Sequence, residues 1–404
     1  MYVSGSYTQN DIIRDIDAAE NGLTSRFQKD GVITDAAEQR YWRELIEKAS
    51  FGRNTVLYDD QGNPSVMVVI PAFTEADVLD EGANLPHPAF IVNGTVKGQI
   101  YISKYPNAYK GSGTSLRAYS LKNVDPGNSI TFDNAILACK QKGTGWHLMT
   151  NAEWAALALL SRKQGFMPRG NNNYGQDISV PSEKAAPSYI YSGAVGRTIT
   201  GSGPISWSHD GTPFGVCDLN GNVWEWVGGL RLNVGEIQIL ADNDAADNTK
   251  DQSASSAEWK AILEDGSLVA PGTANTLKID SPVAGTGVSE NLGEPFINTV
   301  ITNSMNPANT ASNDYLSYGQ TSFETLAAKT GVTIPKILQL LCIAPAFTDC
   351  GGDWFWARNY GERCALRGGR WGGGSVAGVF ALSLDSRRSG SDVSRGFRSA
   401  FVQL

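Results

Sequence analysis

The sequence predicts an α+β protein in which short strands are joined by long loops. The first fifty residues carry apolar side chains at helical spacing, whereas the chain beyond residue 88 alternates short apolar runs with turn residues. The 404 residues include 44 glycines and 10 tryptophans. Glycine adopts backbone angles that other residues avoid, and tryptophan supplies bulk that short strands lack. This combination indicates a loop-rich fold.

Residues 1–88 are expected to form a small helical and hairpin module. Apolar residues recur at helical spacing over residues 12–27 and again over residues 36–49. A cluster of turn-forming residues in the middle of residues 55–70 predicts a β-hairpin. We interpret the module either as an attachment or oligomerisation unit or as a helical cap on the main domain.

Beyond the module, the pattern changes to short strands and two further helices. Strands are predicted over residues 90–92 and 99–103, and helices over residues 131–141 and 151–163. A threonine and a glutamate three residues apart begin the second of these helices. They are typical of a capping box, in which each side chain accepts a hydrogen bond from the backbone of the other residue.

Residues 231–345 differ in composition from their surroundings and are expected to form a long insertion on the side of the domain. The runs 242–248 and 253–256 are polar and contain no aromatic residue. A helix is predicted over residues 323–329, followed by an apolar stretch over residues 334–343. A stretch of this length with so little periodicity is typical of an insertion rather than of core elements.

Three segments, in order along the chain, carry a resemblance to a known family. The first is GWHLMTNAEW at residues 145–154, and the second is FGVCDLNGNVWEW at residues 214–226. The third begins with LRGGRW at Leu366 and reaches GFR at Arg398. Together they resemble the signature segments of the formylglycine-generating-enzyme superfamily. The resemblance implies a C-type lectin fold of that type over residues 89–404.

The second segment places carboxylates on both sides of a tight turn. Asp218 and Glu225 bracket Gly221 and Val223. In the family this segment can hold calcium, which takes oxygen ligands from carboxylates and backbone carbonyls. The resemblance therefore implies calcium as the candidate cofactor at these four residues, and no other cofactor. The alternative is a turn held by hydrogen bonds between carboxylates and the backbone.

Residues 366–401 resemble the variable region of diversity-generating-retroelement proteins, such as phage tropism determinants. In that family selected codons are rewritten, and the altered side chains lie together on one exposed face. The resemblance implies a diversifiable surface that binds a protein or a cell-surface receptor. The positions matching the family pattern, expected to contact the ligand, are Arg370, Gly372, Gly373, Val376, Ser383, Asp385, Ser386, Gly390, Asp392, Val393 and Ser394.

The residues between these positions are expected to form a buried scaffold. Strands are predicted over residues 379–384 and 396–401. Trimers occur among the phage relatives, so the resemblance also implies a homotrimer. The scaffold residues are Trp371, Ala377, Gly378, Phe380, Leu382, Arg388, Phe397 and Arg398.

Catalysis is the main alternative to binding. Formylglycine-generating enzymes bind copper through a cysteine pair placed just after this strand, and the chain has no cysteine beyond Cys364. Soft thiolates are the ligands that copper(I) requires. The three histidines are scattered without metal-ligand spacing. We therefore predict a protein that is not an enzyme, with a formylglycine-generating-enzyme-like oxidoreductase and a glycan-binding lectin as the alternatives.

Charge and cysteine content bear on partners and location. The net charge of −8 gives no electrostatic basis for binding nucleic acid. No run approaches the ~20 apolar residues that cross a bilayer, and residues 1–5 lack the features of a secretory signal. Five irregularly spaced cysteines indicate reduced structural thiols, with a Cys350–Cys364 disulfide as the alternative. The expected location is a phage tail or a bacterial surface after assembly, and otherwise the cytoplasm.

Overall fold

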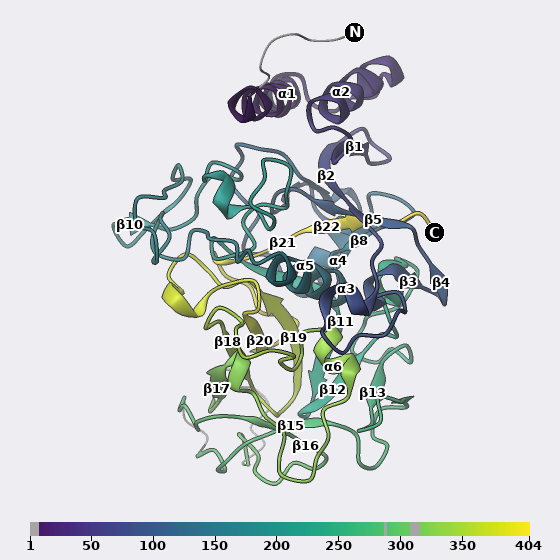
Figure 1. The fold of residues 1–404 in the computed structure, drawn as a ribbon, viewed down its shortest axis with the longest axis vertical. Coiled ribbons are helices and arrows are strands. Elements are labelled where there is room, and N and C mark those ends of the chain that lie inside the picture. Colours follow the sequence, from purple (N-terminus) through teal and green to yellow (C-terminus); the bar gives the residue numbers. More distant parts are fainter. Residues whose placement is uncertain (1–7, 287–288, 308–315) are drawn as a thin grey trace.

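The computed structural model (Figure 1) describes residues 8–286, 289–307 and 316–404, so residues 1–5, where no secretory signal is predicted, lie outside the described residues. The predicted α+β class is confirmed, since the described chain combines several sheets with α-helices. None of these helices is long and apolar enough to cross a membrane. The helices are α1 (Gln9–Asp30), α2 (Ala36–Ala49), α3 (Glu75–Val78), α4 (Phe132–Lys140), α5 (Asn151–Lys163) and α6 (Lys336–Leu340).

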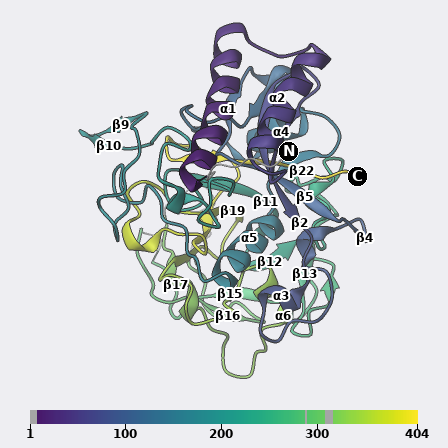
Figure 2. The ribbon, with the colours of Figure 1, turned by 45° about the horizontal axis from the view of Figure 1, so that its top comes forward.

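The two N-terminal helices form one end of the molecule and lie side by side (Figure 2). Helix α1 begins with a capping box between Thr8 and Asp11, and α2 begins where the side chain of Asp35 accepts a hydrogen bond from a backbone N–H. Ile16 and Leu23 of α1 are buried against the rest of the chain. Both predicted helices are therefore confirmed, because their caps and periodicity are local features.

The first sheet joins the two ends of the chain. Its order is β1-β2-β5-β22-β8, and every neighbouring pair is antiparallel. The predicted hairpin is confirmed as β1 and β2, but β2 also pairs with β5, so a domain boundary at residue 88 would cross this sheet. The strands are β1 (Asn54–Tyr58), β2 (Pro64–Pro71), β5 (Gln99–Ser103), β8 (Trp146–Leu148) and β22 (Ser399–Phe401).

The second sheet is larger, and all of its strands come from the part of the chain beyond residue 223. Its main order is β14-β13-β12-β11-β19-β20-β18-β17, with β15, β16 and β21 attached to it. The strands are β11 (Trp224–Asn233), β12 (Glu236–Ile239), β13 (Lys260–Ile262), β14 (Leu268–Val269), β15 (Lys278–Asp280), β16 (Phe296–Asn298), β17 (Gly319–Ser322), β18 (Trp354–Ala357), β19 (Glu362–Arg367), β20 (Leu382–Ser386) and β21 (Arg395–Phe397).

Residues 231–345, predicted as an insertion, supply β12 to β17, which extend the same sheet as β11 and β19 (Figure 1). One expectation within this stretch needs correction. The helix predicted over residues 323–329 is wrong, since only a single 3-10 turn forms at Phe323–Thr325. Beyond it, the Lys329 N–H donates to the carbonyl of Ile297. Pairing with β16 therefore holds this segment in an extended conformation, although its local periodicity favours a helix.

The remaining elements cover the sheets. Three small hairpins are β3 (Ile91–Val92) with β4 (Thr95–Val96), β6 (Ala108–Lys110) with β7 (Arg117–Tyr119), and β9 (Ile190–Tyr191) with β10 (Ala194–Val195). Helix α5 has the predicted capping box, in which Thr150 accepts from the N–H of Glu153. It is buried on nearly every side, and the Trp154 indole donates to the carbonyl of Val379 over 2.7 Å. Helix α5 therefore anchors the chain that leads into β20.

Candidate ligand-binding site

Residues 366–401, the C-terminal segment, form one side of the molecule, with β20 in the middle of the segment. This strand lies between β19 and β18, antiparallel to the former and parallel to the latter. It begins at Leu382 rather than at the predicted residue 379. The reason is a preceding turn, in which Ala381 N–H donates to the Gly378 carbonyl and Phe380 N–H donates to Asp353 Oδ2. Burial raises the pKa of Asp353 to about 8.

Most of the predicted ligand-contacting positions line one cavity, which has a volume of about 380 Å³. The two exceptions are Gly390 and Val393, which do not line it. The nine positions that the fold brings together come from the loop after β19, from β20 and from the loop before β21. They are Arg370, Gly372, Gly373, Val376, Ser383, Asp385, Ser386, Asp392 and Ser394.

Sequence reasoning missed the aromatic part of the cavity. Trp224 and Trp356 line it with their rings edge to face, 5.4 Å between centroids. Trp356 reaches the cavity because β18 pairs with β20 and sets it opposite Ser383. Trp224 stands two residues before the fully buried Trp226 in β11, and strand periodicity places residues two apart on the same face, so no local signal separated the two. The other lining residues outside the predicted set are Leu366, Gly369, Ala377 and Arg395.

Two carboxylates in the cavity are held by hydrogen bonds and ion pairs. Asp385 accepts from the hydroxyls of Ser383 and Ser386, at 2.5 and 3.0 Å, and its other oxygen pairs with Arg358 Nη1 at 2.8 Å. Burial opposes ionisation of Asp385, but Arg358 and the two hydroxyls outweigh it and lower the pKa of this carboxyl. Asp385 is therefore an ionised carboxylate whose charge is already balanced by Arg358.

The second carboxylate, Asp392, organises the loop before β21. It accepts hydrogen bonds from the backbone N–H and the hydroxyl of Ser394, at 2.7 and 2.6 Å. Its other oxygen lies 3.0 Å from Arg395 Nε. The loop is thus ordered by its own side chains, and Ser394 and Arg395 present their remaining surface to the cavity.

The two adjacent glycines in the cavity wall are constrained by their neighbours. A Cβ added at Gly372 would lie 3.0 Å from the hydroxyl of Tyr174, and one added at Gly373 would lie 2.8 Å from the Ala377 Cβ. The contact at Gly372 can relax because the exposed Tyr174 side chain can move. The contact at Gly373 cannot relax in this way, because the Cβ of Ala377 is fixed to the backbone. Gly372 is therefore the more replaceable of the two.

Seven of the eight predicted scaffold residues are buried, although one of them, Ala377, also lines the cavity, and Arg388 is partly exposed. Trp371, Phe380, Leu382 and Phe397 are each at most 1% exposed. Arg398 is fully buried, and its guanidinium donates to both oxygens of Glu225 at 2.7 and 2.9 Å and to three backbone carbonyls. All donor groups of this arginine thereby have acceptors, which is the condition for keeping a charge inside.

This pairing bears on the calcium expectation. Both oxygens of Glu225 already accept from Arg398, and Asp218 accepts from the backbone N–H of Gly201. Burial raises the pKa of Asp218 to about 6. Across the described residues there is no group of three or more acidic, histidine or cysteine side chains that could hold a metal ion. The donor set at Asp218, Gly221, Val223 and Glu225 does not fit calcium, and the hydrogen-bonded turn is the arrangement present.

The cysteines contribute no nucleophile to the cavity. All five carry free thiols, including Cys350 and Cys364, which the alternative had joined. Burial raises the pKa of every one of them, for Cys217 to about 11 and for Cys342 to about 12. Thiols held protonated in this way are inert as nucleophiles and metal ligands.

Comparison with known proteins gives structural matches of low similarity. No protein-family model matches the chain, and no curated protein matches it. Treponema denticola variable protein 1 matches with a TM-score of 0.31 and 12% identity, over 86% of this chain and 98% of that chain. The P3c and U1 variants of the Major Tropism Determinant match with TM-scores of 0.28 and 0.27 at 12% and 11% identity, each over 86% of this chain and 71% of that chain.

Variable proteins and tropism determinants are the class that the C-terminal segment of this sequence resembles. TM-scores of this size are too low to argue a shared fold.

Proposed function

We propose that this chain is a non-catalytic binding protein that presents a diversifiable surface on a C-type lectin scaffold of the formylglycine-generating-enzyme type. Its ligand in this proposal is a protein or a cell-surface receptor. One observation carries it: nine of eleven positions chosen from the sequence pattern line the same cavity. These positions are spread from Arg370 to Ser394, and their convergence on one cavity supports a shared surface.

The composition of the cavity supports binding over catalysis. Its two carboxylates are each engaged by an arginine and by hydroxyls, so neither is poised as a general acid or base. Its lining contains tryptophan, arginine and serine, and no described cysteine or histidine belongs to it. Side chains of these types recognise ligands by shape, hydrogen bonding and charge. The oxidoreductase alternative has no support in this arrangement.

The same proposal covers the location and assembly of the protein. Helices α1 and α2 stand at the end of the molecule away from β15 and β16 (Figure 1). We propose residues 1–88 as the unit that attaches the chain to a phage tail or bacterial surface, or that assembles it into a trimer.

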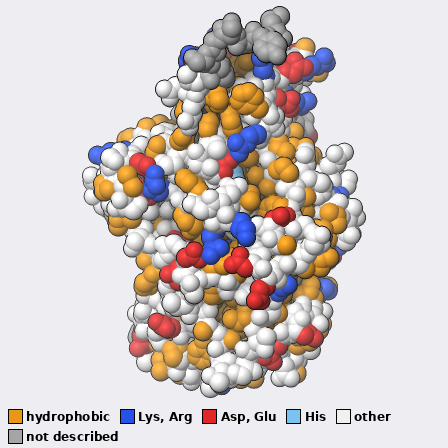
Figure 3. Space-filling view, viewed as in Figure 1, with side chains coloured by type: hydrophobic (Ala, Val, Ile, Leu, Met, Phe, Trp, Pro, Cys, Tyr) orange, Lys and Arg blue, Asp and Glu red, His pale blue; other side chains and the backbone are white. Residues whose placement is uncertain are grey.

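On the face drawn in Figure 3, acidic and basic side chains are interspersed rather than separated.

A display library tests the proposal directly. The full chain is randomised at five cavity positions, displayed on yeast and selected against hen lysozyme as an arbitrary protein target. We expect binders with unchanged folding, because these side chains are replaceable parts of a rigid wall. The five positions are Arg370, Gly372, Val376, Asp392 and Ser394.

A matched library provides the control. It randomises five positions around β14 and in distant loops, most of them more exposed than the cavity positions, where no binders are expected. If both libraries yield binders equally, or if the cavity library yields only unfolded chains, the proposal is wrong. The control positions are Ser267, Leu268, Val269, Val283 and Val300.

A further inference from the structure

A rim of exposed apolar side chains continues the cavity beyond the C-terminal segment. Tyr174, Ile178 and Tyr191 are 46%, 40% and 43% exposed, and none of them belongs to residues 366–401. Single exposed apolar residues are ordinary on protein surfaces, but several gathered beside a cavity mark an interaction surface. We name these three side chains the apolar rim.

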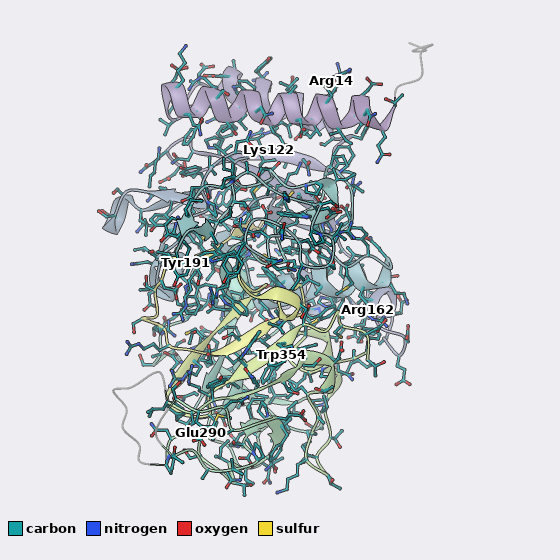
Figure 4. The ribbon with its side chains drawn as sticks, turned by 90° about the vertical axis from the view of Figure 1, so that its left-hand side faces the viewer. Arg14, Lys122, Arg162, Tyr191, Glu290 and Trp354 are labelled. Carbon is teal, nitrogen blue, oxygen red and sulfur yellow. The ribbon has the colours of Figure 1, made fainter. Side chains whose placement is uncertain are left out.

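Contacts with the loop after β19 place the rim beside the cavity. Tyr174 N–H donates to the Trp371 carbonyl over 2.7 Å, and the ring of Tyr191 packs against that of Trp371 with centroids 5.9 Å apart. A Cβ added at Gly374 would lie 3.5 Å from Ile178 Cδ1. Figure 4 faces this side of the molecule and shows the labelled Tyr191. The β9–β10 hairpin and the loops of the C-terminal segment lie on the same side in Figures 1 and 2.

Buried amides hold the rim rigidly to the cavity wall. Asn222 N–H donates to the Asn171 carbonyl over 2.7 Å, and Trp371 N–H donates to the Asn222 carbonyl over 3.2 Å. The Asn222 side chain also accepts from Thr198 N–H at 2.9 Å. Asn171 and Asn222 are fully buried. Because the backbone that carries Tyr174 is tied in this way to the loop at Trp371, binding there would require little ordering of the backbone.

Arg370 supplies an unneutralised charge between the rim and the cavity. Its guanidinium lies over the Trp371 ring, 5.9 Å from the centroid, and it forms no ion pair with any described carboxylate. The other cavity arginine, Arg395, is paired with Asp392. Arg370 is therefore the lining cation that can take a carboxylate from outside.

We infer that the partner is a protein that presents an acidic side chain next to apolar residues. The carboxylate would meet Arg370, whose planar guanidinium binds carboxylates in a bidentate manner. The apolar residues would pack on the rim, where tyrosine beside arginine and tryptophan is the composition of protein–protein hot spots. A protein is favoured over a neutral glycan because the glycan has neither a carboxylate for Arg370 nor an aliphatic side chain for Ile178. This inference rests on the proposed function, since it extends the same site.

A random peptide library tests the inference. Phage-displayed dodecapeptides are selected on the immobilised full chain, and enriched peptides are synthesised and titrated. We expect enriched peptides to carry Asp or Glu beside aromatic or aliphatic residues. Tyr191→Ser and Ile178→Ser should each weaken binding by roughly tenfold. Arg370→Gln should abolish the preference for Asp and Glu.

Matched controls separate the rim from its surroundings. Tyr189 and Tyr191 both pack on Trp371, so Ile190 between them faces the other way, as alternation along a strand requires. Ile190 is 56% exposed, and Ile190→Ser should leave binding within about twofold. Arg40→Gln, on the exposed face of α2, is the corresponding control for charge. Thermal melting of each variant verifies that it remains folded.

The outcomes distinguish this inference from the proposed function. If Val376→Glu in the cavity abolishes peptide binding while the rim and Arg370 variants do not, the inference is overturned and the proposed function stands. If none of these variants affects binding, both fail. Recovery of no peptide above the level of an unrelated coated protein overturns the inference, as does binding confined to glycans on a glycan array.

Discussion

Arg367 and Arg370 are three residues apart, yet they belong to regions of opposite character. Arg367 is fully buried beneath the cavity, and its guanidinium donates to the side chain of Asn151 and to the carbonyls of Leu341 and Cys342. Burial without a nearby carboxylate lowers its pKa to about 10. Arg370 lines the cavity and has no described ion-pair partner. We call the buried residues beneath the cavity, such as Arg367, Trp371 and Arg398, the floor, and the predicted positions that line the cavity the face. The guanidinium groups of the floor are engaged in the fold, whereas Arg370 on the face has a guanidinium with no described carboxylate partner.

The same contrast holds at the far end of the segment. Arg398 is enclosed by Glu225 and three carbonyls. The side chains of Asp392 and Ser394, by contrast, bond to each other and to Arg395 within their own loop, although the carbonyls of both residues accept from distant backbone N–H groups. The Arg398 side chain is thus held by long-range contacts, and the Asp392 and Ser394 side chains by short-range ones. A change on the face should therefore affect recognition more than stability, and a change in the floor should do the reverse. Four predictions test this contrast, from the largest expected effect to the smallest.

Breaking the buried ion pair should cost the most. Arg398→Met leaves the Glu225 carboxylate buried without its partner, which typically destabilises a protein by about 3–5 kcal/mol. Trp371→Ala should cost a similar ~3–5 kcal/mol through the cavity it creates. Chemical denaturation measures both. Arg370→Met is the matched control and should change the free energy of unfolding by less than about 0.5 kcal/mol; equal losses at 398 and 370 would refute the contrast.

The pH dependence of stability should reveal the buried carboxyl of Asp218. Its pKa is raised from 3.8 to about 6 by burial, so the folded state binds a proton more tightly than the unfolded state does. Its favourable contribution is complete below pH 3.8 and is lost as the pH rises through 6.

Asp218→Asn should remove this dependence. The variant should gain about 2–3 kcal/mol in the free energy of unfolding at pH 8, and nothing near pH 3.5. Asparagine also tolerates the left-handed backbone of this position, where φ is 61°. Urea titrations of both proteins at the two pH values measure the effect. A gain of the same size at both pH values would show that proton binding is not its cause.

Replacing Ser383 should have an effect on stability between those of floor and face substitutions, because this residue is buried and also lines the cavity. Its hydroxyl donates to Asp385 over 2.5 Å, and the residue is 4% exposed. Ser383→Ala should cost about 1 kcal/mol and raise the pKa of Asp385, because this hydrogen bond favours the ionised carboxylate. NMR titration of the Asp385 carboxyl follows the second effect. Ser375→Ala, on the exposed part of the neighbouring loop, should change neither quantity.

The smallest effect on stability is expected at the mouth of the cavity. Exchanging Val376 for Thr or Asp392 for Asn should alter the unfolding free energy by no more than about 0.5 kcal/mol. The same exchanges should change which peptides are selected by the chain. Thermal melting and peptide selection are the two measurements, and unfolding of either variant would show that the face is part of the scaffold.

The accuracy of the sequence-based predictions depended on the range of the interactions involved. Helices α1, α2 and α5 could be predicted because caps and apolar periodicity act within a few residues. The helix expected over residues 323–329 failed because its backbone pairs with β16, about thirty residues away. Strand pairing also links the segments on the two sides of residues 88 and 231 within continuous sheets, which no local pattern records.

The candidate site shows the same division. Nine lining positions could be chosen from one continuous stretch of sequence, whereas Trp356 could not, because only the pairing of β18 with β20 brings it there. The apolar rim was also missed, since Tyr174 and Tyr191 lie some two hundred residues before Trp371. The calcium expectation did not allow for Arg398, which reaches Glu225 from 173 residues away.

By itself, the sequence determined the α+β class, the principal helices and the stretch that lines the cavity. Each of these depends on spacing between residues that are close along the chain. Only the tertiary structure decided which arginines are buried and which face outward, and which tryptophans join the cavity. Those outcomes are set by burial and by hydrogen bonds between strands far apart in sequence, whose free energy no local pattern records.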